Sequence, residues 1–191
     1  MLLAELRLLL YRLSWWWYLV AAGLIAASFF LPLETIRQNI LPAALVWPLL
    51  IWSGLGCRET RSDTRQRFFS APHPLWNQIP LVWLTGFAVA LLMGGDTLVR
   101  FGLAGEITSQ LSLAAGLLFI PSLALAFGVW TSSIKAFEVV HVVFWYLGLM
   151  NKVLKPDYLG LHTPNNGPVY LLLSLALFFL VVLGRQRQLR S

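Results

Sequence analysis

Three ionisable side chains at regular spacing are the first candidates for chemistry. Lys135, Glu138 and His141 follow one another three residues apart inside an apolar stretch. Residues at this spacing share a face of a helix. Charged groups inside a membrane span usually face protein or water, so one interpretation of this intramembrane polar cluster is a gating or proton-responsive function against a partner subunit. The alternative is a Lys135–Glu138 pair at the helix start, with Lys135 reaching the surface and His141 hydrogen-bonded inside the bundle.

Two further groups could act as an acid and a base. Asp157 and His162 lie in a polar loop, residues 151–167, which also holds the turn pair Asn166-Gly167. An Asp–His pair could move a proton on a lipid head group. No nucleophile or metal-ligand set accompanies the pair, so the alternative is that this outer loop dips partly into the membrane and caps the bundle.

The longest hydrophilic stretch of the chain, residues 58–77, combines charge with aromatic rings. Glu59 and Asp63 are four residues apart and would stack on one side of a helix, while Phe68 and Phe69 supply apolar contact. Such a mixed helix suits a groove on a protein partner. The alternative is that the arginines serve topology and attraction to anionic lipids. The candidate docking residues are Arg58, Glu59, Arg61, Asp63, Thr64, Arg65, Arg67, Phe68 and Phe69.

Motifs of cofactor and metal chemistry are missing from the sequence. It contains no Gly-rich phosphate loop ending in Lys-Ser/Thr and no zinc-binding His-Glu pair. The single cysteine, Cys57, excludes an intrachain disulfide. The three histidines fall in different parts of the predicted topology, so they do not converge on one metal. We therefore expect no cofactor, no metal and no catalytic residue in this chain.

The composition then sets the fold class. The chain has 191 residues, of which 58% are hydrophobic and 12% charged, whereas a soluble domain is about a quarter charged. We expect an all-α polytopic integral membrane protein. At about 20 residues a span, the chain allows at most six or seven spans in a single transmembrane domain, 1–191, without a catalytic or nucleotide-binding domain. The net charge of +6 then indicates topology rather than nucleic-acid binding.

Hydropathy divides the chain into six predicted spans. An amphipathic interfacial helix, residues 1–14, precedes them, and Trp15-Trp16-Trp17 anchors the first span at the interface. Pro42 and Pro48 could bend the second span, Gly94-Gly95-Asp96 ends the third, and Thr131-Ser132-Ser133 forms a tight turn before the fifth. The predicted spans are Trp15–Leu33, Ile40–Gly56, Ile79–Met93, Ile107–Trp130, Ile134–Met150 and Pro168–Gly184.

The distribution of positive charge orients these spans. Six crossings put both termini on one side, together with the 58–77 segment. Ten of the 14 Lys and Arg residues lie on that side, and the other four are Arg37, Arg100, Lys152 and Lys155. The positive-inside rule therefore places both termini in the cytoplasm. The absence of a targeting peptide in this sequence and the small size suit a bacterial inner membrane.

The arrangement resembles the permease subunits of ABC type-2 exporters. In that family the segment between spans two and three carries an acidic residue, a threonine and a Ser-x-Pro ending, and here Glu59, Thr64 and Ser70-Ala71-Pro72 stand in those places. The stretch from Lys135 to Gly148 also looks like the fifth-span region of uncharacterised members. The resemblance implies that residues 58–77 form a coupling helix that docks on a separate ATPase subunit, which binds the ATP.

The resemblance also implies an assembly. The chain would form a homodimer or pair with a second permease chain, and the path would lie between protomers, lined by the first, second and fifth spans. The small outer loop favours export of a lipid-like, peptide-like or small amphipathic molecule. Two alternatives remain open: a membrane scaffold that recruits a cytoplasmic partner, and an intramembrane enzyme that uses Asp157 and His162, or Glu138 and His141.

Overall fold

A computed structural model of the chain describes residues 13–55, 74–150 and 157–190, with side chains for 13–55, 79–150 and 157–187. The predicted interfacial helix, apart from its last two residues, lies outside this described part. The nine candidate docking residues, from Arg58 to Phe69, lie outside it as well.

The described residues form helices and turns, without a strand. The α-helical segments are α2 (Trp15–Phe30), α3 (Leu33–Thr35), α4 (Leu41–Val46), α5 (Leu49–Ser53), α8 (Pro74–Leu103), α9 (Ile107–Thr131), α10 (Ile134–Phe144) and α11 (Gly167–Arg190). Two wide turns of π-helix, η1 (Ile36–Ile40) and η2 (Trp145–Met150), and one 3-10 turn, η3 (Pro164–Asn166), complete the set.

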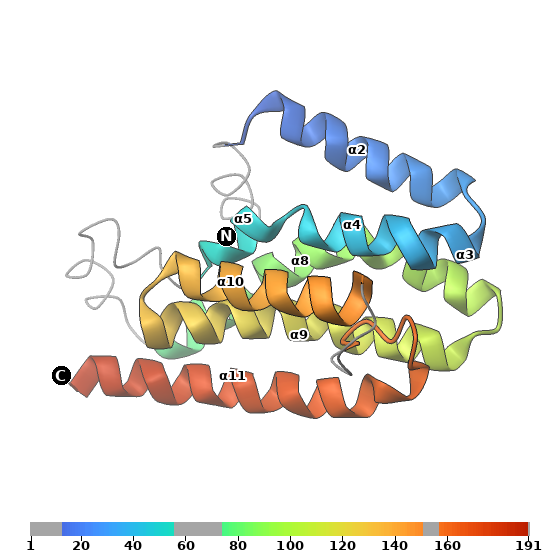
Figure 1. Cartoon of the computed structure of the whole chain (residues 1–191). Coiled ribbons are helices and arrows are strands. Elements are labelled where there is room, and N and C mark those ends of the chain that lie inside the picture. Colours follow the sequence, from blue (N-terminus) through green and yellow to red (C-terminus); the bar gives the residue numbers. More distant parts are fainter. Residues whose placement is uncertain (1–12, 56–73, 151–156, 191) are drawn as a thin grey trace.

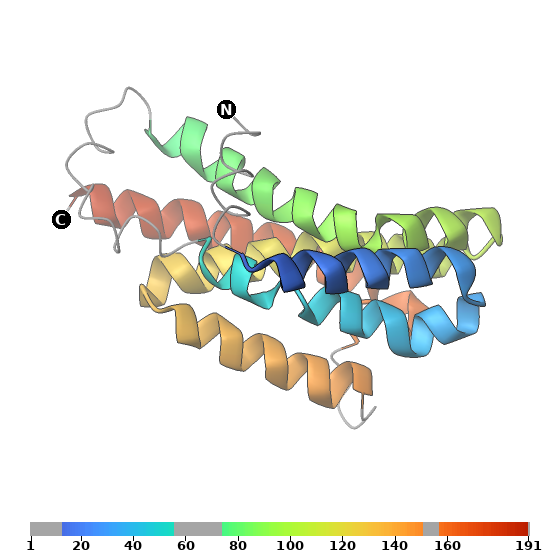
Figure 2. The same cartoon turned by 90° about the horizontal axis from the view of Figure 1, so that it is seen from above.

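Helix α9 forms the centre of the bundle. It lies between α8, α10 and α11, and α2 forms an outer layer over α4 (Figures 1 and 2). Most of α9 is buried, including Ser112, Gly116 and Ser122. Such small residues let neighbouring helices approach closely, which is how helices associate in membranes. The predominantly apolar pattern of α9 therefore fits a helix that is buried along most of its length.

The helices alternate in direction between two ends of the bundle. Helices α2, α8 and α10 run from the end that holds Ser132 toward the end that holds Glu106, and α9 and α11 run back (Figure 1). The C-terminal end of α11 and the start of α2 consequently lie at the Ser132 end. By the predicted topology, the Ser132 end is cytoplasmic and the Glu106 end is the outer end.

Three helices in the described part of the chain are long and apolar enough to cross a membrane: Ile79–Leu103, Ile107–Thr131 and Pro164–Arg187. They cover the third, fourth and sixth predicted spans. Helix α2 has 16 residues, fewer than the approximately 20 that a bilayer core requires. The all-helical fold class is confirmed, and the count of six spans stays a prediction.

The predicted end of the third span at Gly94-Gly95-Asp96 is wrong. Helix α8 continues to Leu103. A glycine inside a helix costs only about 1 kcal/mol, and Gly94 packs closely on α9, where an added Cβ would lie 3.1 Å from Leu117 Cδ2. Gly94 therefore permits close helix packing, and neither glycine ends the helix. At its other end α8 begins at Pro74, so residues 74–77 of the predicted coupling segment belong to this helix.

The second predicted span is interrupted. Helices α4 and α5 are separated at Trp47 and Pro48, because proline has no N–H to continue the helical hydrogen bonds. Pro42 lies in the first turn of α4, where its missing N–H breaks no hydrogen bond. The helical structure starts earlier than predicted, at Leu33, so the polar stretch Glu34 to Asn39 is also helical.

The turn before the fifth predicted span is confirmed. Helix α9 ends at Thr131, Ser132 has a positive φ of 52°, and α10 begins at Ile134. Helix α10 and η2 together run to Met150, as predicted, with a change to the wider π-turn at Trp145. The last helix is longer than its predicted span, because α11 continues past Gly184 to Arg190.

Candidate functional site

The loop before α11 folds around the side chain of Asp157. The carboxylate accepts backbone N–H bonds from Leu161 at 2.9 Å, His162 at 2.6 Å and Thr163 at 2.8 Å, and the Thr163 hydroxyl bond at 3.1 Å. Gly160, with a φ of +65°, supplies the left-handed conformation that this turn needs. Asp157 therefore acts as the brace of the loop 157–163.

The braced loop is inserted against α9. Residues 157–161 are buried. A methyl group added at Gly116 would collide with the Tyr158 carbonyl, and one at Gly160 would collide with Ser112. The Ser112 hydroxyl also donates to the Pro164 carbonyl and accepts from the Gly167 N–H at 3.1 Å. The loop thus covers part of α9 near the Glu106 end rather than lying free on the surface.

Tyr158 carries this loop into a buried cluster of rings. Its ring centroid lies 5.9 Å from that of His141 on α10 and 6.0 Å from that of Phe119 on α9. His141 lies in turn 5.9 Å from the Trp52 ring of α5. We call these rings the central aromatic cluster; its members are Trp52, Phe119, Phe137, His141, Tyr158 and Tyr170.

Two polar atoms in the central aromatic cluster lack a partner among the described residues: His141 Nε2 and the Tyr158 hydroxyl. Both residues are only 1% exposed. The imidazole also has a hydrogen bond to the backbone of Leu45. Burial, followed by the charge of Asp157 and the neighbouring Tyr170, raises the pKa of Tyr158 well above the usual value for a phenol. The phenol is therefore held neutral.

The structure separates the predicted intramembrane polar cluster into a pair and a single residue. Lys135 Nζ lies 3.0 Å from Glu138 Oε2, and the Lys135 side chain is 83% exposed. His141, two turns from Lys135, is buried among rings. The geometry of Lys135 and Glu138 is that of a surface ion pair at a helix start, whereas His141 belongs to the central aromatic cluster.

Asp157 and His162 do not form a side-chain pair. The carboxylate accepts the backbone N–H of His162, while the ring Nε2 of His162 lies 3.2 Å from the Leu149 carbonyl oxygen. A general base needs free acceptor positions directed at a substrate. Because the Asp157 carboxylate already accepts four bonds, this geometry favours a structural role for the carboxylate over acid–base chemistry.

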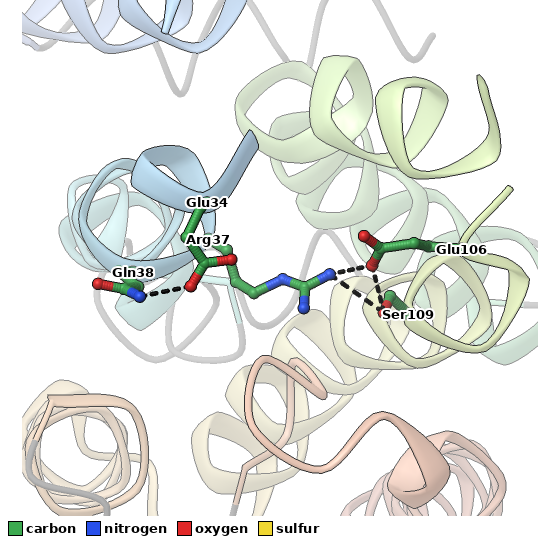
Figure 3. A network of polar contacts seen from close by, with 5 residues as sticks. All are labelled: Glu34, Arg37, Gln38, Glu106 and Ser109. Atoms are coloured by element: carbon green, nitrogen blue, oxygen red, sulfur yellow. Dashed lines mark hydrogen bonds and ion pairs between the residues drawn. The ribbon is translucent and has the colours of Figure 1, made fainter. Parts of the chain in front are cut away.

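An ion pair at the Glu106 end was not anticipated from the sequence. Arg37 of η1 pairs with Glu106, and the same guanidinium nitrogen lies 3.3 Å from the Ser109 hydroxyl (Figure 3). The Arg37 guanidinium carbon also lies 5.0 Å from the centroid of the Phe101 ring. A separate bond joins Gln38 to Glu34 on the solvent side of the same helical segment. The predicted topology did place Arg37 and Glu106 on the same side of the membrane, and this was the one feature of the sequence analysis that could have suggested the pair.

Within the described residues, no group of three or more His, Cys, Asp or Glu side chains is arranged to hold a metal ion. The candidate functional site comprises the central aromatic cluster, the braced loop and the Arg37–Glu106 pair. Comparisons of the chain with protein-family models, with curated proteins and with solved structures give no match.

Proposed function

We propose that this chain is the transmembrane permease subunit of an ATP-binding-cassette exporter, driven by a separate ATPase subunit that docks on residues 58–77. The observation that carries the proposal is a continuous set of contacts between α5, which precedes that segment, and the loop 157–163. Through these contacts, motion at one end of the bundle can reach the other.

The first step of this route joins the two helices that flank the docking segment. Trp52 of α5 donates its indole N–H to the Gly86 carbonyl of α8 at 3.0 Å. An added Cβ at Gly86 would meet Leu55 and Pro121, so the two helices and α9 are in close contact there. A displacement of the docking segment would therefore move α5 and α8 together rather than separate them.

The second step leads from α5 to the outer loop. The Trp52 ring lies beside His141 of α10, and His141 lies beside Tyr158 of the loop. All three side chains are buried. Packed interiors respond to displacement by changing between discrete arrangements. A movement of α5 would thus change the packing of Tyr158, and the loop 157–163 would serve as an outer gate.

The packing of the bundle favours a path between two chains. Helix α9 fills the centre, and the loop 157–163 covers part of it, so a single bundle leaves its middle occupied. The apolar faces of α2 and α10 are exposed in the isolated chain, with Phe30 and Val139 among the residues on them. A homodimer, or a pair with a second permease chain, would create a path along these faces in a bacterial inner membrane.

Affinity purification tests this proposal. The tagged chain, isolated in mild detergent, should bring with it a nucleotide-binding subunit and ATPase activity. Glu59→Arg, or Phe68→Ala combined with Phe69→Ala, should leave membrane insertion intact and release that subunit. Glu34→Gln, an exposed carboxylate on the opposite side of the predicted topology, is the matched control and should retain it.

Two outcomes would contradict the proposal. If the ATPase subunit still associated after both docking changes, residues 58–69 would not form the interface with that subunit. Recovery of the chain with a partner that does not hydrolyse ATP would favour the membrane scaffold instead. Mass spectrometry of the eluate, together with an ATPase assay on it, separates these outcomes.

A further inference from the structure

A carboxylate inside α8 has no partner in the described structure. Both oxygens of Asp96 are shielded from solvent, and neither has a hydrogen-bond partner among the described residues. Buried polar groups are nearly always paired, and ionisable groups within membrane spans mark substrate or ion pathways by default. The residue as a whole is partly exposed, and its carboxylate has acceptor positions that no described residue fills.

The neighbouring contacts place Asp96 on the side of α8 that faces α2. Arg100, one turn further on the same face of α8, donates to the backbone carbonyl of Ser28 near the end of α2. The Ser28 hydroxyl is itself directed to the Ile25 carbonyl at 2.6 Å, so it does not serve the carboxylate. Asp96 thus lies along the seam between α2 and α8, within the last two turns of α8.

Exposed apolar side chains flank this seam on the outside of the bundle. Leu92, one turn before Asp96 on the same face, is 58% exposed, and Leu103, two turns after it, is 85% exposed. Phe29 and Phe30 at the end of α2 are exposed as well. In a membrane these side chains contact lipid. An apolar molecule could therefore reach the seam laterally without crossing water.

We propose that Asp96 binds the ammonium group of an amphipathic amine that enters between α2 and α8 from the membrane. An ionised carboxylate only accepts hydrogen bonds, so its partner must donate, and a positively charged N–H group supplies both a donor and the opposite charge. The exposed leucines suit an aliphatic or aromatic remainder. An anionic molecule would be repelled by the carboxylate.

The site assigns amphipathic amines as the substrate class of the proposed exporter. Transport of an amine rests on the proposed function, whereas binding of an amine at Asp96 does not. Binding itself requires the full chain and no ATPase. A wild-type chain that purifies without any ATPase subunit would therefore contradict the exporter while leaving an amine site in place, and failure of amine binding would remove the site while leaving the exporter.

The experiment uses the purified full chain in dodecyl maltoside micelles and a fluorescent primary amine, monodansylcadaverine, with fluorescence anisotropy as the readout. We expect saturable binding that Asp96→Asn weakens by about tenfold or more, the loss expected for one charge-assisted hydrogen bond. Asp96→Glu, which keeps the charge, should bind within a few fold of the wild type. Glu34→Gln should bind as the wild type does.

Further arms identify the occupant. The N-acetylated probe, which has no charge, should not bind saturably. Phosphatidylethanolamine, whose headgroup carries an N–H ammonium, is added to the micelles and compared with phosphatidylcholine, whose headgroup ammonium has no N–H. If only phosphatidylethanolamine displaces the probe, Asp96 binds the ammonium of a lipid headgroup as well as that of a free amine. Thermal unfolding of Asp96→Asn verifies that the variant is folded.

Three results would overturn the proposal. Equal binding of the acetylated probe would mean partition into the micelle. Unchanged binding by a folded Asp96→Asn variant would place the amine elsewhere. Displacement of the probe by sodium chloride, but not by choline chloride at the same ionic strength, would assign the carboxylate to an inorganic cation.

Discussion

The imidazole of His141 and the phenol of Tyr158 lie 5.9 Å apart, centroid to centroid, at an interplanar angle of 52°. This contact joins α10 to the braced loop. His141 Nε2 and the Tyr158 hydroxyl both lack a hydrogen-bond partner among the described residues. The contact therefore depends on the packing of the rings, and the Tyr158 hydroxyl can be removed without loss of the ring that carries it.

Alkaline pH should destabilise the protein through Tyr158. Burial raises the pKa of this phenol above its unfolded value of about 10, so its contribution to stability is complete below pH 10 and is lost as the pH rises above that value. Tyr158→Phe should therefore flatten the fall in melting temperature between about pH 9 and pH 11. At neutral pH the same change should alter the free energy of unfolding by less than about 1 kcal/mol, because the hydroxyl is unpaired.

Thermal unfolding in detergent across this pH range is the measurement for Tyr158. Tyr146→Phe is the control, because Tyr146 is exposed. If Tyr158→Phe followed the same alkaline profile as the wild type, the buried phenol would have no part in the loss of stability.

Removing the brace should loosen the loop. Asp157→Asn replaces one carboxylate oxygen by an amide group that cannot accept N–H bonds, and we expect a loss of about 1–3 kcal/mol in the free energy of unfolding. Asp157→Ala should lose at least as much. Melting temperature and protease susceptibility of the loop 157–163 report the change.

The same variant also tests the enzyme alternative. An Asp157→Asn protein with normal stability, but without an activity that the wild type retains after loss of every ATPase partner, would establish acid–base chemistry at Asp157.

The close approach of the loop to α9 should make Gly116 intolerant of a side chain. Gly116→Ala forces a methyl group against the Tyr158 carbonyl, so the melting temperature should fall despite the better helix propensity of alanine. Gly95→Ala is a matched control on α8, where an added Cβ meets nothing within 4 Å. That change should be neutral or stabilise by up to about 1 kcal/mol. Equal melting temperatures for the two variants would show that the loop does not lie against α9.

The ion pairs Arg37–Glu106 and Lys135–Glu138 should differ in strength. The Arg37 and Glu106 side chains are 22% and 38% exposed, whereas those of Lys135 and Glu138 are 83% and 16% exposed. A double-mutant cycle with Arg37→Gln and Glu106→Gln should give a coupling of about 1 kcal/mol that weakens with salt, near the upper end for partly exposed pairs. The cycle for Lys135 and Glu138 should give less than about 0.5 kcal/mol. A coupling for Lys135 and Glu138 as large as that of the outer pair would contradict this order.

Glu138→Gln separates the two interpretations of the predicted intramembrane polar cluster. A surface ion pair predicts normal transport, with abundance changed little, since the partner Lys135 is exposed. A gating cluster predicts impaired transport at unchanged abundance. Transport and membrane abundance have to be measured on the same preparation for this comparison.

The sequence was most informative where one local signal decided the structure. The run Thr131-Ser132-Ser133 predicted the turn between α9 and α10, and that turn is present because Ser132 adopts the left-handed conformation. Long apolar runs located the three helices of the described part of the chain that are long and apolar enough to span a membrane. Gly94-Gly95 misled the prediction, because a glycine pair in a sequence does not distinguish a helix end from a site of close helix packing.

The candidate site depended on contacts that no local pattern contains. Arg37 and Glu106 are 69 residues apart, and only the fold brings them together. Asp157 was considered as an acid or base because of its residue type, but its function depends on the four groups that surround it. His141 is buried inside the bundle, and its neighbours, Trp52 and Tyr158, come from two other parts of the chain.

The enclosure of α9 determines how the protein would respond to its membrane. With 25 residues, α9 is about 38 Å long, more than the approximately 30 Å of a typical hydrocarbon core. Helix α11, by contrast, exposes Leu172, Leu175 and Phe179 on the outside of the bundle. In a membrane, hydrophobic mismatch would therefore act on α11, which packs along α9 (Figure 1). A thinner bilayer would tilt the two helices together. The length of the lipid acyl chains would therefore influence the helix tilt of the whole bundle.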